Sequence, residues 1–230
     1  MPECRFALIE CAIGQEGSVM QRLTRIIGRN FGHPRGPVGR LTAGMMRKGN
    51  ASLSLWMVEL LDVKPRDRVL EIGFGPGVAL AALVAHAADG VVTGVDASEL
   101  MVRQVRARLA AEIASGHLIV RQGDAASLPD GDATFDAVCG AHVVYFWPDP
   151  VATVRELRRV LRPGGTLALA YQERGHMPPI ALRTTGQIAA QLFGPGEVEQ
   201  VARAAGFADV RVATQGAPDS PTGFCLLATK

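Results

Sequence analysis

From Arg68 onward, short apolar runs alternate with longer segments whose apolar residues recur at helical spacing. The short runs have the length and β-branched composition of buried strands, and the longer segments are typical of amphipathic helices. Such alternation predicts βαβ units and a parallel sheet. The expected strands are 68–73, 91–96, 117–124, 134–140 and 166–172, and the expected helices between them are 77–88, 98–115 and 149–165, the last ended by a Pro-Gly-Gly stop.

The end of the chain follows a different pattern. A helix over 196–206 precedes two strand-like segments, 208–214 and 222–230, joined by the turn-rich sequence QGAPDSP. A connection this short joins neighbouring strands only in antiparallel orientation. The sequence therefore predicts an α/β fold whose last strand pair is antiparallel.

The N-terminal part of the chain is expected to form a separate helical cover, residues 1–57, on a main domain of residues 58–230. Residues 17–30 have one apolar helical face and one arginine-rich face, and helices near 42–48 and over 52–63 follow. We expect the first helix to pack on the domain or on a second subunit; the alternative is contact with an anionic membrane surface. The stretch 39–56, rich in Met and small residues, would give the acceptor pocket an adaptable apolar wall.

Composition narrows the class of protein. The 230 residues suffice for one domain with a sizeable core, and the net charge of +2 gives no reason to expect a nucleic-acid partner. No apolar run approaches the roughly 20 residues of a membrane span, and the charged N-terminus does not resemble a signal peptide. The four cysteines lack CxxC spacing and the five histidines lack metal-ligand spacing. We therefore expect a cytoplasmic protein with free thiols and no metal site. We also expect a monomer or a homodimer, although no residue decides the oligomeric state.

Residues 69–77, VLEIGFGPG, place Gly73, Gly75 and Gly77 directly after a very apolar strand. Glycine lets the backbone approach a ligand closely because it has no Cβ. The dinucleotide motif G-x-G-x-x-G is not met, since Val78 occupies its last position when Gly73 is the first. The pattern is E-x-G-x-G-x-G, and the alternative to a ligand site is a tight strand-to-helix turn.

Acidic residues end the next two strands. Asp96, in GVDAS, can accept both hydroxyls of a ribose, and Asp124, in QGDAASLP, can accept the amino group of an adenine. The alternatives are a helix N-cap for Asp96 and a turn residue for Asp124. Since the carboxyl ends of parallel strands meet at one edge, all these polar groups would face one crevice.

Five segments, VLEIGFGPG, VTGVDAS, GDAASLP, FDAVCGAHVVYFWPDP and LRPGGTLAL, together resemble the ordered motifs of class I S-adenosylmethionine-dependent methyltransferases. The resemblance covers about residues 50–230 and is greatest to the small-molecule group that includes quinone-biosynthesis methyltransferases. It implies a Rossmann-like three-layer sandwich with a mostly parallel seven-stranded sheet and an antiparallel last strand pair. It also implies S-adenosylmethionine as the cofactor.

The resemblance assigns roles to individual residues. Glu71 would support the amino end of the cofactor, Asp96 the ribose hydroxyls, Asp124 the adenine amino group, and the backbone at Ala141 the methionine part. The full set of implied cofactor-binding residues is Glu71, Gly73, Gly75, Gly77, Asp96, Ala97, Asp124, Ala125, Ala141 and His142.

The resemblance implies methyl transfer to a small, partly apolar acceptor by in-line displacement, which needs alignment more than a dedicated base. Candidate catalytic residues after the fourth and fifth strands are His142, Tyr145 and Tyr171. A histidine suits general base chemistry, but the alternatives are that His142 only lines the cofactor pocket and that the tyrosines pack. Two other functions stay open: a lipid or quinone methyltransferase at the membrane surface, and a non-catalytic cofactor-binding partner subunit.

Overall fold

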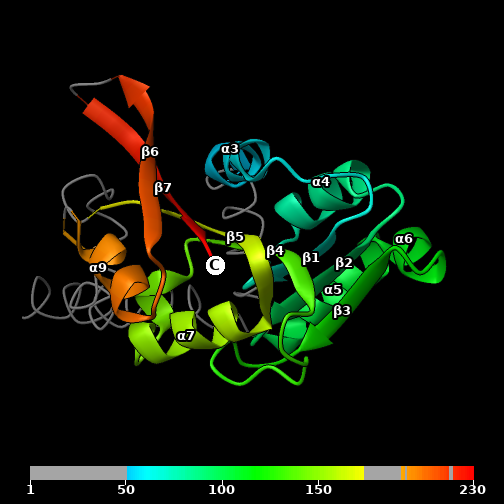
Figure 1. The fold of residues 1–230 in the computed structure, drawn as a ribbon. Coiled ribbons are helices and arrows are strands. Elements are labelled where there is room, and N and C mark those ends of the chain that lie inside the picture. Colours follow the sequence, from blue (N-terminus) through cyan, green and yellow to red (C-terminus); the bar gives the residue numbers. More distant parts are fainter. Residues whose placement is uncertain (1–50, 174–192, 195, 218–219) are drawn as a thin grey trace, which may run out of the picture.

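The computed structural model describes residues 51–173, 193–194, 196–217 and 220–230. These residues form a seven-stranded sheet in the order β3-β2-β1-β4-β5-β7-β6, with helices packed against it (Figure 1). The strands are β1 Arg68–Ile72, β2 Val91–Asp96, β3 Leu118–Gln122, β4 Phe135–Ala141, β5 Leu161–Tyr171, β6 Asp209–Ala217 and β7 Ser220–Thr229. The helices are α3 Ala51–Leu61, α4 Val78–His86, α5 Glu99–Arg108, α6 Ala110–Ala114, α7 Pro150–Val160 and α9 Glu197–Ala204, with a 3₁₀ turn η1 at Val144–Phe146.

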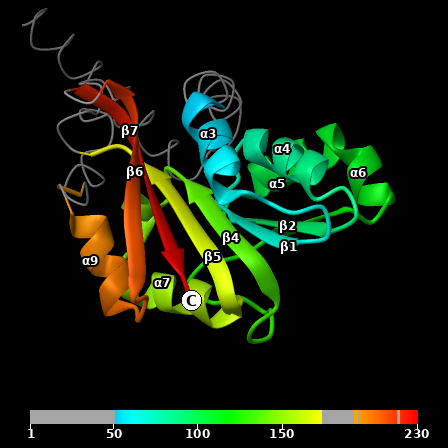
Figure 2. The same cartoon turned by 45° about the horizontal axis from the view of Figure 1, so that its top comes forward.

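The directions of the strands confirm the predicted fold class. β1 pairs in parallel with β2 and β4, and β3 and β5 extend this parallel sheet on either side. β7 runs antiparallel to both β5 and β6. β6 and β7 run side by side as a long hairpin whose tip projects beyond the described helices (Figure 2).

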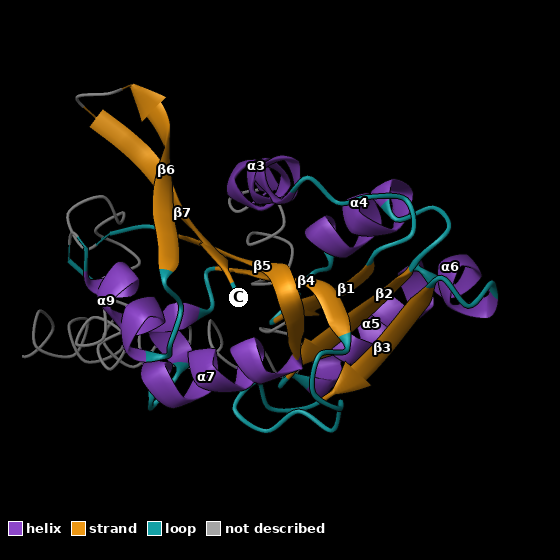
Figure 3. Ribbon diagram, in the orientation of Figure 1, coloured by secondary structure: helices purple, strands orange, loops and turns teal. Residues whose placement is uncertain are grey.

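Helices cover both faces of the sheet, which gives the three layers (Figure 3). Side chains along each strand alternate between the two layers of core. Val69 of β1 packs in the cluster that contains Met57 of α3 and Leu83 of α4. Its neighbour Leu70 packs in the other cluster, with Leu157 of α7. Consecutive residues of a central strand therefore pack against helices on opposite faces of the sheet.

The predicted helix over 98–115 is wrong in one respect, because it is two helices. α5 ends at Arg108 and α6 begins at Ala110, and Leu109 between them has φ −108° and ψ 38°. That conformation does not propagate an α-helix. The Leu109 side chain is buried with the core that contains α4, so the apolar periodicity continues across the break and conceals it.

The predicted helix over 149–165 is too long. α7 ends at Val160 because Leu161 is already extended, at φ −71° and ψ 142°. The Pro-Gly-Gly sequence lies inside β5 and does not end the helix. There Gly164 donates its N–H to the carbonyl of Lys230 at 2.7 Å, and Lys230 donates to Gly165 at 3.0 Å. The start of β5 is thus tied to the end of the chain.

The predicted helices over 17–30 and 42–48, and most of the connection between residues 172 and 193, lie outside the described residues. Within the described residues, no helix is long and apolar enough to cross a membrane. The same part of the chain contains no group of three or more His, Cys, Asp or Glu side chains that could hold a metal ion.

Candidate functional site

A cavity of about 720 Å³ opens at the carboxyl ends of the parallel strands β1, β2, β3 and β4. Its volume is in the range of small-molecule and cofactor sites. Residues of α3, α4, α5 and α7 complete the wall. Nine of the ten predicted cofactor-binding residues line it: Glu71, Gly73, Gly75, Asp96, Ala97, Asp124, Ala125, Ala141 and His142.

The glycine loop after β1 follows a path that side chains would obstruct. Gly73 has φ 62°, and a Cβ there would lie 2.5 Å from Cγ1 of Val143. Its N–H donates to the carbonyl of Val95 at 2.7 Å, which ties the loop to β2. Gly75 has φ 49°, and a Cβ there would meet no atom within 4 Å. The first glycine therefore serves close packing, and the second serves the backbone conformation.

Gly77 does not line the cavity; it is the residue before α4, with φ 70°. Its carbonyl accepts a hydrogen bond from Nη2 of Arg108, on α5, at 2.8 Å. The third glycine of the motif thus shapes the end of the loop, where α4 begins. Its predicted contact with a cofactor stays a prediction.

Asp96 joins the glycine loop to the end of β2. Its side chain is buried, and Oδ2 accepts from the N–H of Gly75 at 2.8 Å while Oδ1 accepts from the N–H of Ser98 at 2.7 Å. The N-cap of α5 is Ser98, whose hydroxyl accepts from Met101. Asp96 is therefore not the helix cap that the sequence left as an alternative. Two backbone donors fix its carboxylate at the cavity wall.

Glu71 places a second carboxyl group in the cavity wall, and only 3% of the residue is exposed. Its Oε2 is buried and has no hydrogen-bond partner among the described residues. Burial, and then the charge of Asp96, raise the pKa of Glu71 to about 8. A buried carboxyl with an unpaired oxygen is complementary to a cation. The role that the resemblance implies for Glu71, support of the amino end of the cofactor, stays a prediction.

The loop after β3 brings Asp124 to the same cavity. Oδ1 of Asp124 accepts from the N–H of Ala126 at 2.9 Å, so this residue also makes the turn that the sequence left as an alternative. The neighbouring Gln122 donates from Nε2 to the carbonyl of Ala97 at 3.1 Å, and Gly123 donates to the carbonyl of Asp96 at 3.1 Å. The loops after β2 and β3 are therefore joined to one another.

His142 lies just after β4, half-buried in the cavity wall with a left-handed backbone at φ 58°. Its backbone N–H donates to the carbonyl of Ala170 at 2.8 Å. Burial lowers the pKa of the imidazole to about 4. The ring is therefore neutral at physiological pH and offers one donor and one acceptor nitrogen.

Tyr145 and Tyr171 are buried and are not among the residues that line the cavity. The Tyr145 hydroxyl donates to the carbonyl of Gln172 at 3.1 Å and also accepts from the Gln172 N–H, and burial raises its pKa above the usual range. Tyr171 stacks on Phe224 with ring centroids 5.6 Å apart. These contacts are those of packing residues, and a catalytic role for either tyrosine stays a prediction.

Sequence reasoning did not single out several other lining residues as ligands. Ser54 of α3 is buried and lines the cavity, although Leu53 and Met57 beside it belong to an apolar helical face. A polar residue at a buried helical position was the available signal. Ser54 lies within the predicted cover, whose division from the main domain stays a prediction. The other lining residues from α4, α5, the segment after β4 and the first turn of α7 are Val78, Ala79, Met101, Val143, Phe146, Pro148, Asp149, Ala152 and Thr153. Trp147, an aromatic residue after the fourth predicted strand and a sequence candidate for contact with the acceptor, lines the cavity too.

Comparison with known proteins places the chain in a family. Residues 70–169 match the family described as a methyltransferase domain. The chain is 31% identical over 216 residues to the demethylmenaquinone methyltransferase of Roseiflexus sp. (strain RS-1), covering 81% of this chain and 86% of that protein.

Two further matches differ in their coverage. The chain is 37% identical over 110 residues to the 27-O-demethylrifamycin SV methyltransferase of Amycolatopsis mediterranei, covering 48% of this chain and 40% of that protein. The chain thus spans less than half the length of the first curated relatives that it matches. The fold matches the crystal structure of a SAM-dependent methyltransferase from Aquifex aeolicus with a TM-score of 0.64, at 22% identity, over 80% of this chain and 92% of that one.

The extent of the Roseiflexus match, the methyltransferase domain and the E-x-G-x-G-x-G loop at a cavity that also holds Asp96 and Asp124 lead to one assignment. The chain belongs to the class I S-adenosylmethionine-dependent methyltransferase family.

Proposed function

We propose that the protein transfers the methyl group of S-adenosylmethionine to a small-molecule acceptor by in-line displacement. The observation that carries the proposal is the gathering of Glu71, Asp96 and Asp124, from the ends of three adjacent strands, around one cavity. The cofactor, when bound, supplies a methyl group already activated by its sulfonium. The residues of the chain therefore have to bind, orient and exclude water.

Each of the three carboxyl groups would bind a different part of the cofactor. Glu71 would hold the amino group, because its buried Oε2 needs a donor. Asp96 would hold the ribose hydroxyls from the position that the backbone of Gly75 and Ser98 fixes. Asp124 and its neighbour Ala125, at the end of β3, would receive the adenine amino group and ring.

His142 and the backbone of Ala141 would border the methionine part and the acceptor. A base whose conjugate acid has a pKa of about 4 removes protons poorly at neutral pH. His142 is therefore better suited to orient the acceptor by a hydrogen bond than to deprotonate it. An acceptor that is already nucleophilic would fit this arrangement.

The apolar part of the wall supports a partly apolar acceptor. Val143, Phe146 and Trp147 line the cavity directly after β4. A hydrophobic wall with few polar groups orients a ligand by shape and excludes water from the reacting atoms. Such a wall is suited to an aromatic or alicyclic ring.

A second candidate is a quinone or another lipid as the acceptor. It is favoured by the named activity of the Roseiflexus relative, demethylmenaquinone methylation, together with the apolar wall. Under this proposal, residues 17–30 bring the site to a membrane surface. The first candidate needs no such contact.

Incubation of the purified protein with methyl-labelled S-adenosylmethionine and host-cell extract tests the proposal. Label in the organic fraction supports a partly apolar small molecule, a quinone or a lipid as the acceptor, and label in the aqueous fraction supports a polar metabolite and contradicts the partly apolar one. Asp96→Ala should weaken cofactor binding by about 1–3 kcal/mol, and Glu99→Gln, a change at an exposed carboxylate paired with Arg103 on α5, should not. Cofactor binding without any transfer would instead support the non-catalytic partner subunit.

We also propose that the protein is cytoplasmic and acts as a monomer or homodimer. Cys139 and Cys225 are buried free thiols, which suit a reducing compartment. Fractionation of host cells and light scattering of the purified protein test the two statements separately. A thiol-oxidising location, or a larger assembly, would contradict them.

A further inference from the structure

The loop between β3 and β4 carries Asp124 and Ala125 to the cavity and then returns across the end of α7. Backbone hydrogen bonds tie its two ends to the domain, through Gly123 to Asp96 and through Ala133 and Thr134 to α7, and the bonds of the turn between these ends are local. Ser127 donates to the carbonyl of Asp124 at 3.2 Å, and Ala126 donates to the Asp124 side chain. Both bonds lie within one turn, so they shape the turn without fixing it to the domain.

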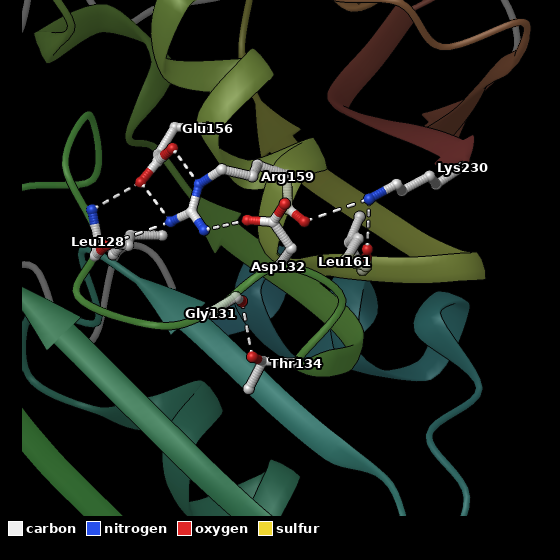
Figure 4. Close-up of polar contacts among 8 residues, drawn as sticks. All are labelled: Leu128, Gly131, Asp132, Thr134, Glu156, Arg159, Leu161 and Lys230. Carbon is white, nitrogen blue, oxygen red and sulfur yellow. Dashed lines mark hydrogen bonds and ion pairs between the residues drawn. The ribbon is translucent and has the colours of Figure 1, made fainter.

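Two side chains of α7 fix this loop from outside. Oε1 of Glu156 accepts the N–H of Leu128 at 2.8 Å, and Nη2 of Arg159 donates to the carbonyl of the same residue at 3.2 Å. Both backbone groups of Leu128 are thus held by one helix (Figure 4). The side chain of Leu128 is buried, which adds an apolar anchor.

The side chains of Glu156 and Arg159 also form an ion pair with each other. Arg159 forms a two-pronged pair with Glu156, from Nε to Oε2 and from Nη2 to Oε1, each at 2.8 Å. Its Nη1 donates to Oδ1 of Asp132, farther along the loop, at 2.7 Å. Figure 4 shows Arg159 between these two carboxylates. A planar guanidinium that meets a carboxylate in this way has little rotational freedom left.

The end of α7 is fixed as well. Nζ of Lys230 donates to the carbonyls of Arg159 and Leu161, at 3.2 and 2.7 Å. In addition, Ala133 and Thr134 donate to the carbonyls of Arg159 and Val160 at 3.1 and 2.8 Å. The helix that grips the loop is therefore itself anchored to β5 and to the last residue of the chain.

The face of α7 that grips the loop continues to the cavity. Ala152 lines the cavity, and Glu156 and Arg159 follow it at helical spacings of four and three residues. Residues at such spacings lie on one face of a helix. One face of α7 thus touches both the cavity and the loop that ends at it.

We propose that Glu156 and Arg159 are positioning residues for recognition of the adenine ring, acting through Leu128 on the placement of Asp124 and Ala125. The inference rests on the proposed function, because it assigns the adenine to this end of the cavity. Neither side chain lines the cavity. We therefore expect them to affect the selectivity for adenine over other nucleobases, and to do so only through the loop.

The test compares two ligands that differ at one group, S-adenosylhomocysteine and S-inosylhomocysteine, by titration calorimetry. The inosine form has a carbonyl oxygen where adenine has its amino group, so that position accepts a hydrogen bond and does not donate to Asp124; its ring N1–H donates from a different position. Wild-type protein should bind the adenine form about tenfold to a hundredfold more tightly, as expected for a hydrogen bond to a charged group. Glu156→Ala should reduce this ratio to about threefold or less, because the loop no longer presents Asp124 in one place.

Further variants separate positioning from stability. Glu156→Gln retains an oxygen that can accept the Leu128 N–H but loses the charge pair, so it should give an intermediate ratio. Arg159→Lys loses the two-pronged pair and should lower the ratio as well. Glu99→Gln removes an exposed ion pair with Arg103 on α5, at i-to-i+4 spacing, as a control, and it should leave the ratio unchanged. If Glu156→Ala does not fold, Glu156→Gln and Arg159→Lys decide the result.

A fall in affinity for both ligands by the same factor, with the ratio kept, would show that the two residues only stabilise the fold and would overturn the inference. Absence of any binding of S-adenosylhomocysteine by the wild type would instead overturn the proposed function. Hydrogen exchange gives a second readout. Amides 124–128 should lose protection in Glu156→Ala, and amides of β1 should not.

Discussion

Replacing the buried carboxyl of Glu71 by an amide, in Glu71→Gln, tests whether this carboxyl is protonated in the folded protein. Glu71 faces the apolar cluster on the α3 and α4 side of the sheet, and its pKa is raised to about 8 by burial and by Asp96. Glutamine has nearly the same shape as protonated glutamic acid but does not ionise. The substitution therefore removes the titration and keeps the packing.

The sign of the effect follows from where each state holds its proton. Below pH 4.5 the carboxyl is protonated in both the folded and the unfolded protein, and it gives no pH dependence. Between pH 4.5 and about 8 the unfolded chain releases the proton while the folded protein keeps it, so the free energy of unfolding falls as pH rises. At about 1.4 kcal/mol per pH unit this interval corresponds to at most ~5 kcal/mol. Water entry and relaxation reduce the loss, and we expect ~2–5 kcal/mol.

Urea unfolding of the ligand-free protein at several pH values between 5 and 8.5 measures the difference. The free energy of unfolding of Glu71→Gln minus that of the wild type should grow with pH across this range. Glu59→Gln, the same change at an exposed position of α3, serves as the control and should not alter the slope. Parallel curves for wild type and Glu71→Gln would refute the reasoning, since they would mean that Glu71 ionises equally easily in both states.

Three further predictions concern the same site. Binding of S-adenosylhomocysteine at pH 7 should release close to one proton from the wild type and none from Glu71→Gln, measured by calorimetry in buffers of different ionisation enthalpy. Gly73→Ala should destabilise the protein by ~2–4 kcal/mol, since it adds a clash with Val143 to backbone strain, whereas Gly75→Ala should lose only ~1–2 kcal/mol in urea unfolding. Tyr145→Phe should cost about 1–3 kcal/mol through unpaired backbone groups; an unchanged turnover number would exclude catalysis by its hydroxyl, and a large fall would support it.

Much of the fold was predictable because its signals are local. A run of apolar β-branched residues is typical of a buried parallel strand. The short connection before β7 permits only an antiparallel pair. The break at Leu109 was not predictable, because a buried residue in a non-helical conformation keeps the helical periodicity intact. The position of Pro163, the proline of the Pro-Gly-Gly sequence, inside β5 was not predictable either. Proline can follow the end of a helix and can also lie in the irregular first part of a strand.

The site residues at the strand ends were predictable, but those placed by the turns after the strands were not. Strand-end residues such as Asp96 and Asp124 must meet at one edge, because topology alone brings them there. Whether a side chain then faces the cavity depends on turns that the sequence does not specify. The left-handed backbone at His142 and the 3₁₀ turn after it leave Tyr145 buried under the backbone of Gln172.

The position of Glu71 is hard to explain by stability alone. Its pairing partner on β4 is Cys139, which is buried, and Val69 on the same face of β1 is fully buried as well. An apolar residue would therefore suit the position. The fold instead keeps a carboxyl that has an unpaired oxygen and lies close enough to Asp96 for their charges to interact. Groups that lower the stability of the folded protein in this way concentrate at functional sites. An ammonium group at Oε2 of Glu71 would give that oxygen a donor and offset the repulsion from Asp96, so ligand affinity and the stability of the ligand-free protein are coupled through this residue.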